Sequence, residues 1–328
     1  MKDRLIIGTR GSALALAQTR RVAAALEAAN PGLETELRVI RTTGDAVQKT
    51  PLSEIGDRGL FVREIEEALL RSEVDLAVHS LKDLPSADPE DLCLAAVPCR
   101  EDARDALITP RAFPRSTPWA ERLPQGATVG TSSLRRKSQL LHLRPDLLVT
   151  NFRGNVDTRL RKLSSGDVDA CILACAGLDR LGVFPQTGTR LPLDAFVPAP
   201  GQGALALQSR RDDARVALLC SPLEDPLVRG AVTAERRVMS ALQGGCQVPL
   251  GVHARPLELD SGDGPRLATQ MEMLAFVASP DGQTVIRATE GGEVSKPIEL
   301  ADRVVSSLRS QGVEELLGSF LEGANRVD

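Results

Sequence analysis

Short apolar segments alternate with helix-like segments through the first 80 residues, and this order constrains the fold most. Residues 4–10 (RLIIGTR), 34–41 (ETELRVIR) and 74–79 (VDLAVH) have the apolar content of strands. The Ala- and Leu-rich stretch up to Ala29 and the amphipathic stretch 60–73 favour helices. A strand–helix–strand order of this kind is typical of a largely parallel sheet covered by helices. We therefore predict an α/β fold.

The pattern begins again near residue 127, which indicates a second lobe. Residues 130–133 (GTSS) stand between a predicted strand and a predicted helix, as residues 8–12 (GTRGS) do near the N-terminus. Residues 167–171 (DVDAC) enter an apolar strand, as residues 73–77 (EVDLA) do. Two matches in the same order favour two lobes of similar architecture.

The last third of the chain has a different pattern. Residues 204–208 (ALALQ) form a predicted strand that could return to the first sheet, and residues 225–243 form a long helix. Two alternating runs are then joined by Ser279-Pro280-Asp281-Gly282, a hairpin signal, before two short helices. We predict a small C-terminal α+β domain. The predicted boundaries are 1–103 plus 203–222 for domain 1, 104–202 for domain 2 and 223–328 for domain 3.

Composition excludes several classes of protein. There are 40 basic and 44 acidic side chains, and aromatic residues make up only 2%. This balance argues against a nucleic-acid partner. No apolar run approaches the length of a membrane span, and residues 1–8 do not have the pattern of a secretory signal. The six cysteines include no CxxC pair and there are three histidines, so we expect no metal site and a reduced, cytoplasmic protein.

A polar pair follows the most strongly apolar strand. Residues 74–79 lead directly into Ser80-Leu81-Lys82-Asp83, and Pro85 stops the strand from continuing. In open α/β sheets, ligands bind outside the carboxyl ends of the strands. Lys82 and Asp83 are therefore candidate functional residues, although the pattern alone also fits ordinary loop charges.

Residues 131–162 carry a net positive charge within an otherwise acidic chain. Asp146 and Asp157 are the acids there, against eight basic residues: Arg135, Arg136, Lys137, Arg144, Arg153, Arg159, Arg161 and Lys162. Arg135 and Arg136 fall in the first turn of a predicted helix, where the helix dipole disfavours cations unless an anion lies between them. For Lys137, Arg161 and Lys162 we expect a solvated helix face. We predict an inter-lobe cleft that holds a ligand rich in carboxylate or phosphate groups.

Cys246 stands in a loop shaped by Gly244-Gly245 before it and Pro249 after it. The other cysteines are expected to pack as small apolar side chains, and Cys246 could do the same. A Cys–His protease is poorly supported, because no histidine signature accompanies it. Covalent attachment of a group through its sulfur remains open on composition alone.

The chain resembles the porphobilinogen deaminase (hydroxymethylbilane synthase) family over nearly its whole length. The resemblance rests on ordered blocks with the expected spacing: GTRGSALALAQ (8–18), GLFVREIEEALL (59–70), DLAVHSLKDLP (75–85), REDARDA (100–106), VGTSSLRRKSQL (129–140), RGNVDTRL (153–160), AGLDRLG (176–182), PGQGALAL (200–207) and QGGCQVPLG (243–251).

This resemblance implies three domains, of which the first two have the fold of type II periplasmic binding proteins with the catalytic cleft between them. The third carries a loop whose cysteine, here Cys246, holds a dipyrromethane cofactor by a thioether. The implied reaction is a transferase step of tetrapyrrole biosynthesis. Four porphobilinogen molecules are condensed head to tail with loss of ammonia, and hydrolysis releases hydroxymethylbilane.

The resemblance also implies roles for individual residues. Asp83 matches the family's catalytic carboxylate, expected to act as general acid and base and to stabilise cationic pyrrole intermediates. Each pyrrole carries an acetate and a propionate, which gives an arginine-rich cleft a physical purpose. The residues that match cofactor or substrate carboxylate contacts are Arg10, Ser12, Lys82, Thr131, Ser133, Arg135, Arg136, Arg153, Arg159 and Arg180.

Residues 51–61 match the family's lid, where many relatives carry lysine at the positions of Glu54 and Arg58. Arg58 and Phe61 are the lid candidates here. The expected partner is porphobilinogen, with no nucleic acid, no membrane and a monomeric state. The alternative is a non-catalytic, two-lobed anion-binding protein, which would need neither Asp83 nor Cys246. A phosphate transferase lacks the GxxxxGK[ST] loop that would support it.

Overall fold

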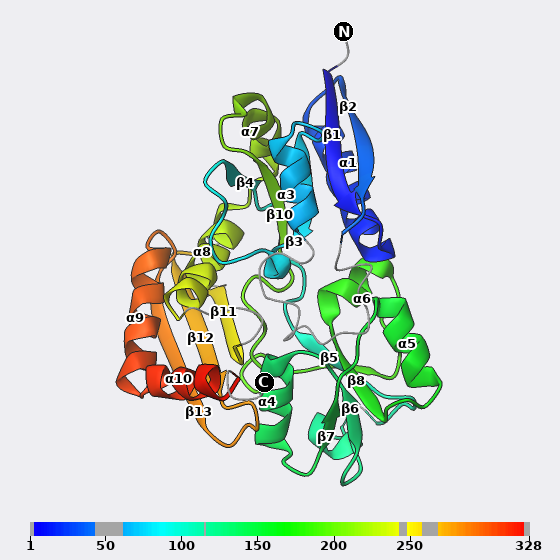
Figure 1. Ribbon diagram of the computed structural model, residues 1–328, viewed down its shortest axis with the longest axis vertical. Helices are drawn as coiled ribbons and strands as arrows, with labels where there is room; N and C mark the ends of the chain where they lie inside the picture. The colour runs from blue at the N-terminus through cyan, green and yellow to red at the C-terminus, as the bar shows by residue number, and fades with distance from the viewer. Residues whose placement is uncertain (1–2, 43–61, 115, 243–247, 258–267, 325–328) are drawn as a thin grey trace, which may run out of the picture.

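A computed structural model describes residues 3–42, 62–114, 116–242, 248–257 and 268–324, with side chains described up to residue 318. Its strands form two five-stranded sheets and one three-stranded sheet. Figure 1 shows the two larger sheets at opposite ends of the molecule and the small sheet beside both. Among the described residues, no helix combines the length and apolar content needed to cross a membrane. The predicted α/β class is confirmed.

The first lobe is built on the strand order β2-β1-β3-β10-β4. Strands β1, β2 and β3 are parallel, whereas β10 runs antiparallel between β3 and β4. The returning strand predicted at 204–208 is thus confirmed in the first sheet. The bounds in this lobe are β1 (Asp3–Arg10), α1 (Ala13–Ala29), β2 (Leu33–Ile40), α3 (Arg63–Leu70), β3 (Leu76–Ser80), β4 (Leu92–Ala96), β10 (Leu205–Arg210) and α7 (Ala214–Cys220).

The second lobe repeats this plan in the order β7-β6-β8-β5-β9. Here β5 takes the place of β10 and runs antiparallel to both of its neighbours. The order in both lobes fits the type II periplasmic-binding-protein arrangement that the resemblance implied. The bounds are β5 (Asp105–Ile108), β6 (Thr128–Gly130), α4 (Leu134–Leu143), β7 (Leu148–Thr150), α5 (Val156–Ser164), β8 (Ala170–Ala174), α6 (Cys175–Leu181) and β9 (Gly188–Arg190).

The repeat extends to single hydrogen bonds. Asp75 donates its N–H to the Ile6 carbonyl and accepts the Ile6 N–H on its carboxylate, at 2.8 Å in each case. Asp169 does the same with Thr128, at 2.9 and 2.7 Å. These are the aspartates of the EVDLA and DVDAC segments, so the sequence match reflects one structural device used twice. The prediction of two similar lobes is confirmed.

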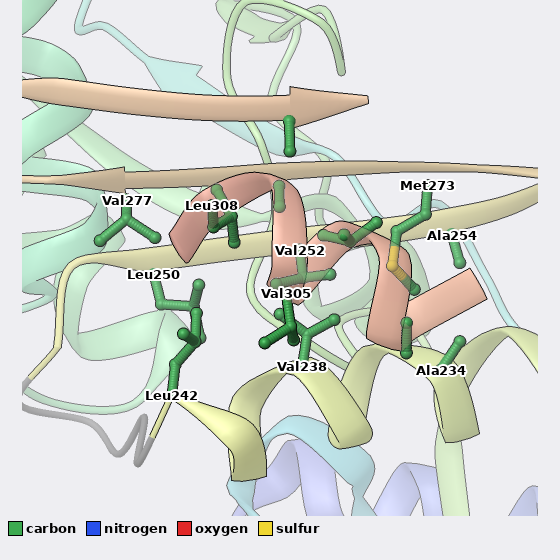
Figure 2. Packing of buried hydrophobic residues seen from close by; sticks show 14 of the residues in the cluster. Ala234, Val238, Leu242, Leu250, Val252, Ala254, Met273, Val277, Val305 and Leu308 are labelled. Carbon is green, nitrogen blue, oxygen red and sulfur yellow. The ribbon is translucent and has the colours of Figure 1, made fainter. Parts of the chain in front are cut away.

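The C-terminal unit packs α8 and α9 on an antiparallel sheet in the order β11-β12-β13, and α10 packs against α9. Figure 2 shows its core, where Val238 of one helix and Leu242 just after that helix meet Leu250 and Val252 of a strand and Val305 of a second helix. The predicted small α+β domain is confirmed. The bounds are α8 (Pro226–Ala241), β11 (Leu250–Leu257), β12 (Gln270–Ala278), β13 (Val285–Glu293), α9 (Pro297–Ser310) and α10 (Val313–Ala324).

Several elements differ from the sequence predictions. The helix predicted at 60–73 spans only 63–70 within the described residues, and the strand predicted at 168–175 ends at Ala174 because Cys175 begins α6. Strands β5, β9 and β11 were not predicted. Strands β5 and β9 are four and three residues long, which is too short for a periodic signal. The domain boundaries given above stay a prediction.

Two chain crossings join the lobes and lie side by side. The isolated bridge between Arg100 and Ala204 pairs them, and the Glu101 N–H donates to the Gly203 carbonyl at 3.0 Å. Gly203 has a φ of +89°, and a Cβ there would lie 2.4 Å from the Glu101 carbonyl oxygen. Only glycine allows this approach. Gly203, the second glycine of the PGQGALAL block, therefore allows the two crossings to stay in contact.

Candidate active site

A cavity of about 670 Å³ lies between the two lobes. It receives the carboxyl ends of β1, β3 and β6 and the first turns of α1, α4 and α5. Among the described residues, its charged lining comprises seven arginines and Lys82 against two aspartates, Asp83 and Asp157. The cleft is therefore strongly basic, although the whole chain carries a formal charge of −4. Such a cavity favours an anionic ligand.

Asp83 is fixed in position by apolar neighbours in the chain. The segment Leu81–Asp83 forms a single 3₁₀ turn after β3, and the Leu84 N–H donates to the Leu81 carbonyl at 3.1 Å. Leu81 and Leu84 are both buried and belong to one core cluster with Val232 of α8. Their burial turns the intervening side chains outward, so Lys82 and the exposed Asp83 line the cavity. The predicted pair is thus at the predicted strand end.

Arg135 and Arg136, at the start of α4, are buried side by side. The anion between them is the protein's own Asp105, which is fully buried. Arg135 Nη1 lies 2.8 Å from Asp105 Oδ2, and Arg136 Nη2 lies 2.7 Å from Oδ1. Burial by itself would raise the pKa of Asp105, but the charges of Arg135 and Arg136 outweigh it and hold that pKa below the usual range. The group therefore keeps one net positive charge.

We expect Asp105→Asn to lower the free energy of unfolding by about 3–5 kcal/mol, because two guanidinium groups would stay buried without their counter-charge. Urea denaturation at pH 7 measures this. A carboxyl whose pKa is lowered by folding stabilises the fold above its ordinary pKa. The difference between the two proteins should therefore shrink as the pH falls below about 4. Asp302→Asn, which breaks a half-exposed pair with Arg237, should leave the urea midpoint near that of the wild type.

Arg159 and Arg180 extend the basic lining in the second lobe. Arg159 donates its Nε–H to the Gly154 carbonyl at 2.8 Å. Burial lowers the pKa of Arg159 to about 10, the charge of Arg136 adds to this, and Asp83 opposes it from the other lobe. Arg180 donates to the Gly203 carbonyl at 2.6 Å and lies 2.8 Å from Glu101. Both arginines therefore face the cleft where the first lobe presents Asp83.

The two lobes offer equivalent helix starts to the cavity. Ser12 caps α1 by accepting the Ala15 N–H at 3.3 Å, and Ser133 caps α4 by accepting the Arg136 N–H at 3.4 Å. Thr131 accepts the Ser133 N–H at 3.2 Å. These caps set the first turns of both helices toward the cleft, where N–H groups favour anions. Figure 1 shows α1 reaching α6, which it contacts across the cleft.

Comparison with known proteins agrees with this geometry. The family description "Porphobilinogen deaminase, dipyromethane cofactor binding domain" matches residues 5–218, and "Porphobilinogen deaminase, C-terminal domain" matches residues 230–310. The porphobilinogen deaminase of Syntrophobacter fumaroxidans is 47% identical over 97% of this chain and 98% of its own length. That of Desulforudis audaxviator is 44% identical over 99% and 100%.

The chain belongs to the porphobilinogen deaminase family. Among solved structures, the VFT2 domain of Bordetella pertussis BvgS aligns with a TM-score of 0.41 and 16% identity, over 67% of this chain and 85% of that one.

The structure brings together all of the family-matched side chains that it describes. Eleven of them line the one cavity: Arg10, Ser12, Lys82, Asp83, Thr131, Ser133, Arg135, Arg136, Arg153, Arg159 and Arg180. Cys246, Arg58 and Phe61 lie outside the described residues. Both flanks of the Cys246 loop line the cavity, through Met239 of α8 and Val248 before β11. The C-terminal unit therefore contributes apolar side chains to the basic cleft.

This cavity fits the dipyrromethane that the family description names. That group carries four carboxylates, and the lining offers guanidinium groups and two capped helix starts for them. The described residues hold no group of three or more His, Cys, Asp or Glu side chains that could bind a metal ion.

Two buried residues that hold the charged side chains of the cavity in place were not predicted from the sequence. Asp105 holds the arginine pair, and Gln202 contacts both Asp105 and Lys82. Both stand within family blocks, REDARDA and PGQGALAL, but neither was singled out. The available signal for Asp105 was its place directly before the apolar run Ala106–Ile108, where a buried strand begins.

Proposed function

We propose that this chain is the porphobilinogen deaminase that its family membership indicates, a transferase of tetrapyrrole biosynthesis. It joins four porphobilinogen molecules head to tail, releases ammonia at each condensation and frees hydroxymethylbilane by hydrolysis. The observation that carries the proposal is the position of Asp83, an exposed carboxylate in a cavity lined by eight cationic side chains. A site built only to bind anions would gain nothing from an exposed carboxylate among its cationic side chains.

Asp83 performs the proton transfers. Departure of ammonia requires a proton on the amine, and positive charge then develops on the pyrrole that loses it. A carboxyl group beside the pyrrole can donate that proton in its acid form and, once ionised, stabilise the cation. Lys82 lies in the same 3₁₀ turn as Asp83, and Arg159 lines the same cavity from the second lobe.

The basic residues hold carboxylates. Arg10 and Ser12 of the first lobe face the start of α4 and the arginines of the second lobe across the cavity. Acetate and propionate groups can therefore be held from both sides, which fixes the reacting carbon near Asp83. We assign Arg135 and Arg136 to the growing chain and Arg10 to the incoming substrate.

Cys246 is the proposed attachment point of dipyrromethane. When bound, this cofactor supplies the primer to which the first substrate is joined. The second-lobe arginines, with Thr131 and Ser133, would hold the carboxylates of this cofactor. They line the same cavity as Met239 and Val248, which flank the Cys246 loop. We also propose that the protein is a cytoplasmic monomer, and that Arg58 and Phe61 belong to a lid.

The function is tested by supplying porphobilinogen to the purified holoenzyme. We expect porphobilinogen consumption with one ammonia released for each molecule, measured by colorimetric and enzymatic assays. The alternative, a two-lobed anion-binding protein, predicts binding of porphobilinogen without ammonia release. Family membership does not favour that alternative. Saturable binding with no ammonia formed would reject the proposed function.

A further inference from the structure

Gln202 lies at the crossing between the lobes and is fully buried. Its neighbours Gly201 and Gly203 have φ of +72° and +89°, so the backbone makes a tight turn around it. Gly201 packs on Leu81, the residue before Lys82. The side chain of Gln202 thus starts from the lobe crossing and lies between the two halves of the site.

The contacts of the Gln202 amide define its orientation. Its Nε2 donates to the Ala103 carbonyl at 2.7 Å and to Asp105 Oδ1 at 3.0 Å. Both acceptors lack a proton, so the reversed amide would place an oxygen against two oxygens. The amide oxygen must therefore point the other way, where it accepts from Lys82 Nζ at 3.3 Å.

Lys82 has an unfavourable setting for a charged amine. Burial lowers the pKa of Lys82 to about 8, and the charges of Arg136 and Arg135 add to this. Asp83 and Asp105 oppose them. A hydrogen-bond acceptor beside the ammonium favours its charged form. Among the described residues, the Gln202 oxygen is the side-chain acceptor that the Lys82 ammonium reaches.

We propose that Gln202 is a positioning residue that keeps the Lys82 ammonium charged and in place, and so connects the Asp83 turn of the first lobe to the arginine pair of the second. The chain of contacts runs from Lys82 through Gln202 to Asp105 and its two arginines. The effect of Gln202 on turnover rests on the proposed function, whereas its effect on the Lys82 ammonium does not.

The direct test is the titration of Lys82 in the holoenzyme labelled with ¹³C at lysine Cε. The sequence has lysine at positions 2, 49, 82, 137, 162 and 296, so few signals are expected, and Lys82→Gln identifies the one that belongs to Lys82. In Gln202→Met the midpoint of Lys82 should fall by about one pH unit, because one hydrogen bond to a charged group is lost. Gln202→Asn keeps the amide on a shorter side chain, so its Lys82 midpoint should lie between those of the wild type and Gln202→Met.

Gln208→Met is the matched control. Gln208 is also fully buried and also donates its Nε2–H to a carboxylate at 2.9 Å, but that carboxylate belongs to Glu66 of α3 and not to Asp105. This variant should leave the Lys82 midpoint unchanged. A larger fall in Gln202→Met than in Gln202→Asn, with no fall in Gln208→Met, could not come from a general loosening of the fold. An unchanged Lys82 midpoint in both Gln202 variants would overturn the proposal.

A kinetic measurement tests the consequence for the substrate. Because Lys82 is proposed to contact carboxylates, Gln202→Met should raise KM for porphobilinogen about tenfold and change kcat less. A lower kcat at unchanged KM would contradict this positioning role. If the wild type releases no ammonia from porphobilinogen, the proposed function fails, and the Lys82 titration still decides the role of Gln202.

Discussion

Asp83→Asn should lower kcat for porphobilinogen by at least about a hundredfold, the usual contribution of a general acid or base. Asparagine has nearly the same shape as aspartate, but it can neither exchange a proton with the substrate nor stabilise a cation by a negative charge. Leu81 and Leu84 anchor the turn on both sides, so the replaced side chain should stay in place. Steady-state kinetics, with a thermal melt to verify the fold, measures the effect.

Two further variants make this result specific. Asp83→Glu keeps a carboxylate and should retain more activity than Asp83→Asn. Asp212→Asn removes an exposed carboxylate just after β10, outside the cavity lining, and should be as active as the wild type. A fall in kcat of less than about threefold in Asp83→Asn would be far below the usual contribution of a general acid or base. Proton transfer would then have to be assigned to another group.

Cys246→Ser should abolish both the covalent cofactor and the activity. A thioether requires a sulfur nucleophile, and a serine hydroxyl is a much weaker one at neutral pH. Intact-mass spectrometry should find the wild-type chain heavier than its sequence by one dipyrromethane and the variant at its sequence mass. Ammonia release from porphobilinogen should fall to background in the same sample.

Cys99→Ser provides the comparison for the mass measurement. Cys99 is exposed and does not line the cavity, so this variant should keep the added mass and the activity. An unmodified wild-type chain with full activity would remove the cofactor from the proposal. An added mass that persists in Cys246→Ser would move the attachment to another residue.

The sequence predicted the fold where its signals were periodic or duplicated. The EVDLA and DVDAC segments indicated two similar lobes, and both aspartates make the same pair of backbone contacts. Strand β5 was not predicted, because four residues are too few to show an alternation of apolar and polar side chains. The role of Asp105, its first residue, was missed for the same reason. The anion expected between Arg135 and Arg136 is present, but it comes from within the chain.

Residues of the site could be predicted where they belong to a recognisable motif, but the hydrogen bonds between them could not. Lys82 and Asp83 stand at a strand end that the apolar run indicates, whereas the contact of Lys82 with Gln202 joins residues 120 positions apart. A contact at that separation depends on how the lobes meet, which no local pattern records. The same reason explains why burial of Arg100 against Glu235 of α8 could not be foreseen.

The antiparallel strand β10 has a consequence for the order of folding during synthesis. It lies between β3 and β4, so the first sheet lacks an inner strand until Arg210 has left the ribosome. The second sheet uses only the continuous segment from Asp105 to Arg190 and can close earlier. Domains generally fold as units as the chain emerges. The lobe that begins the polypeptide is therefore completed after the lobe inserted within it.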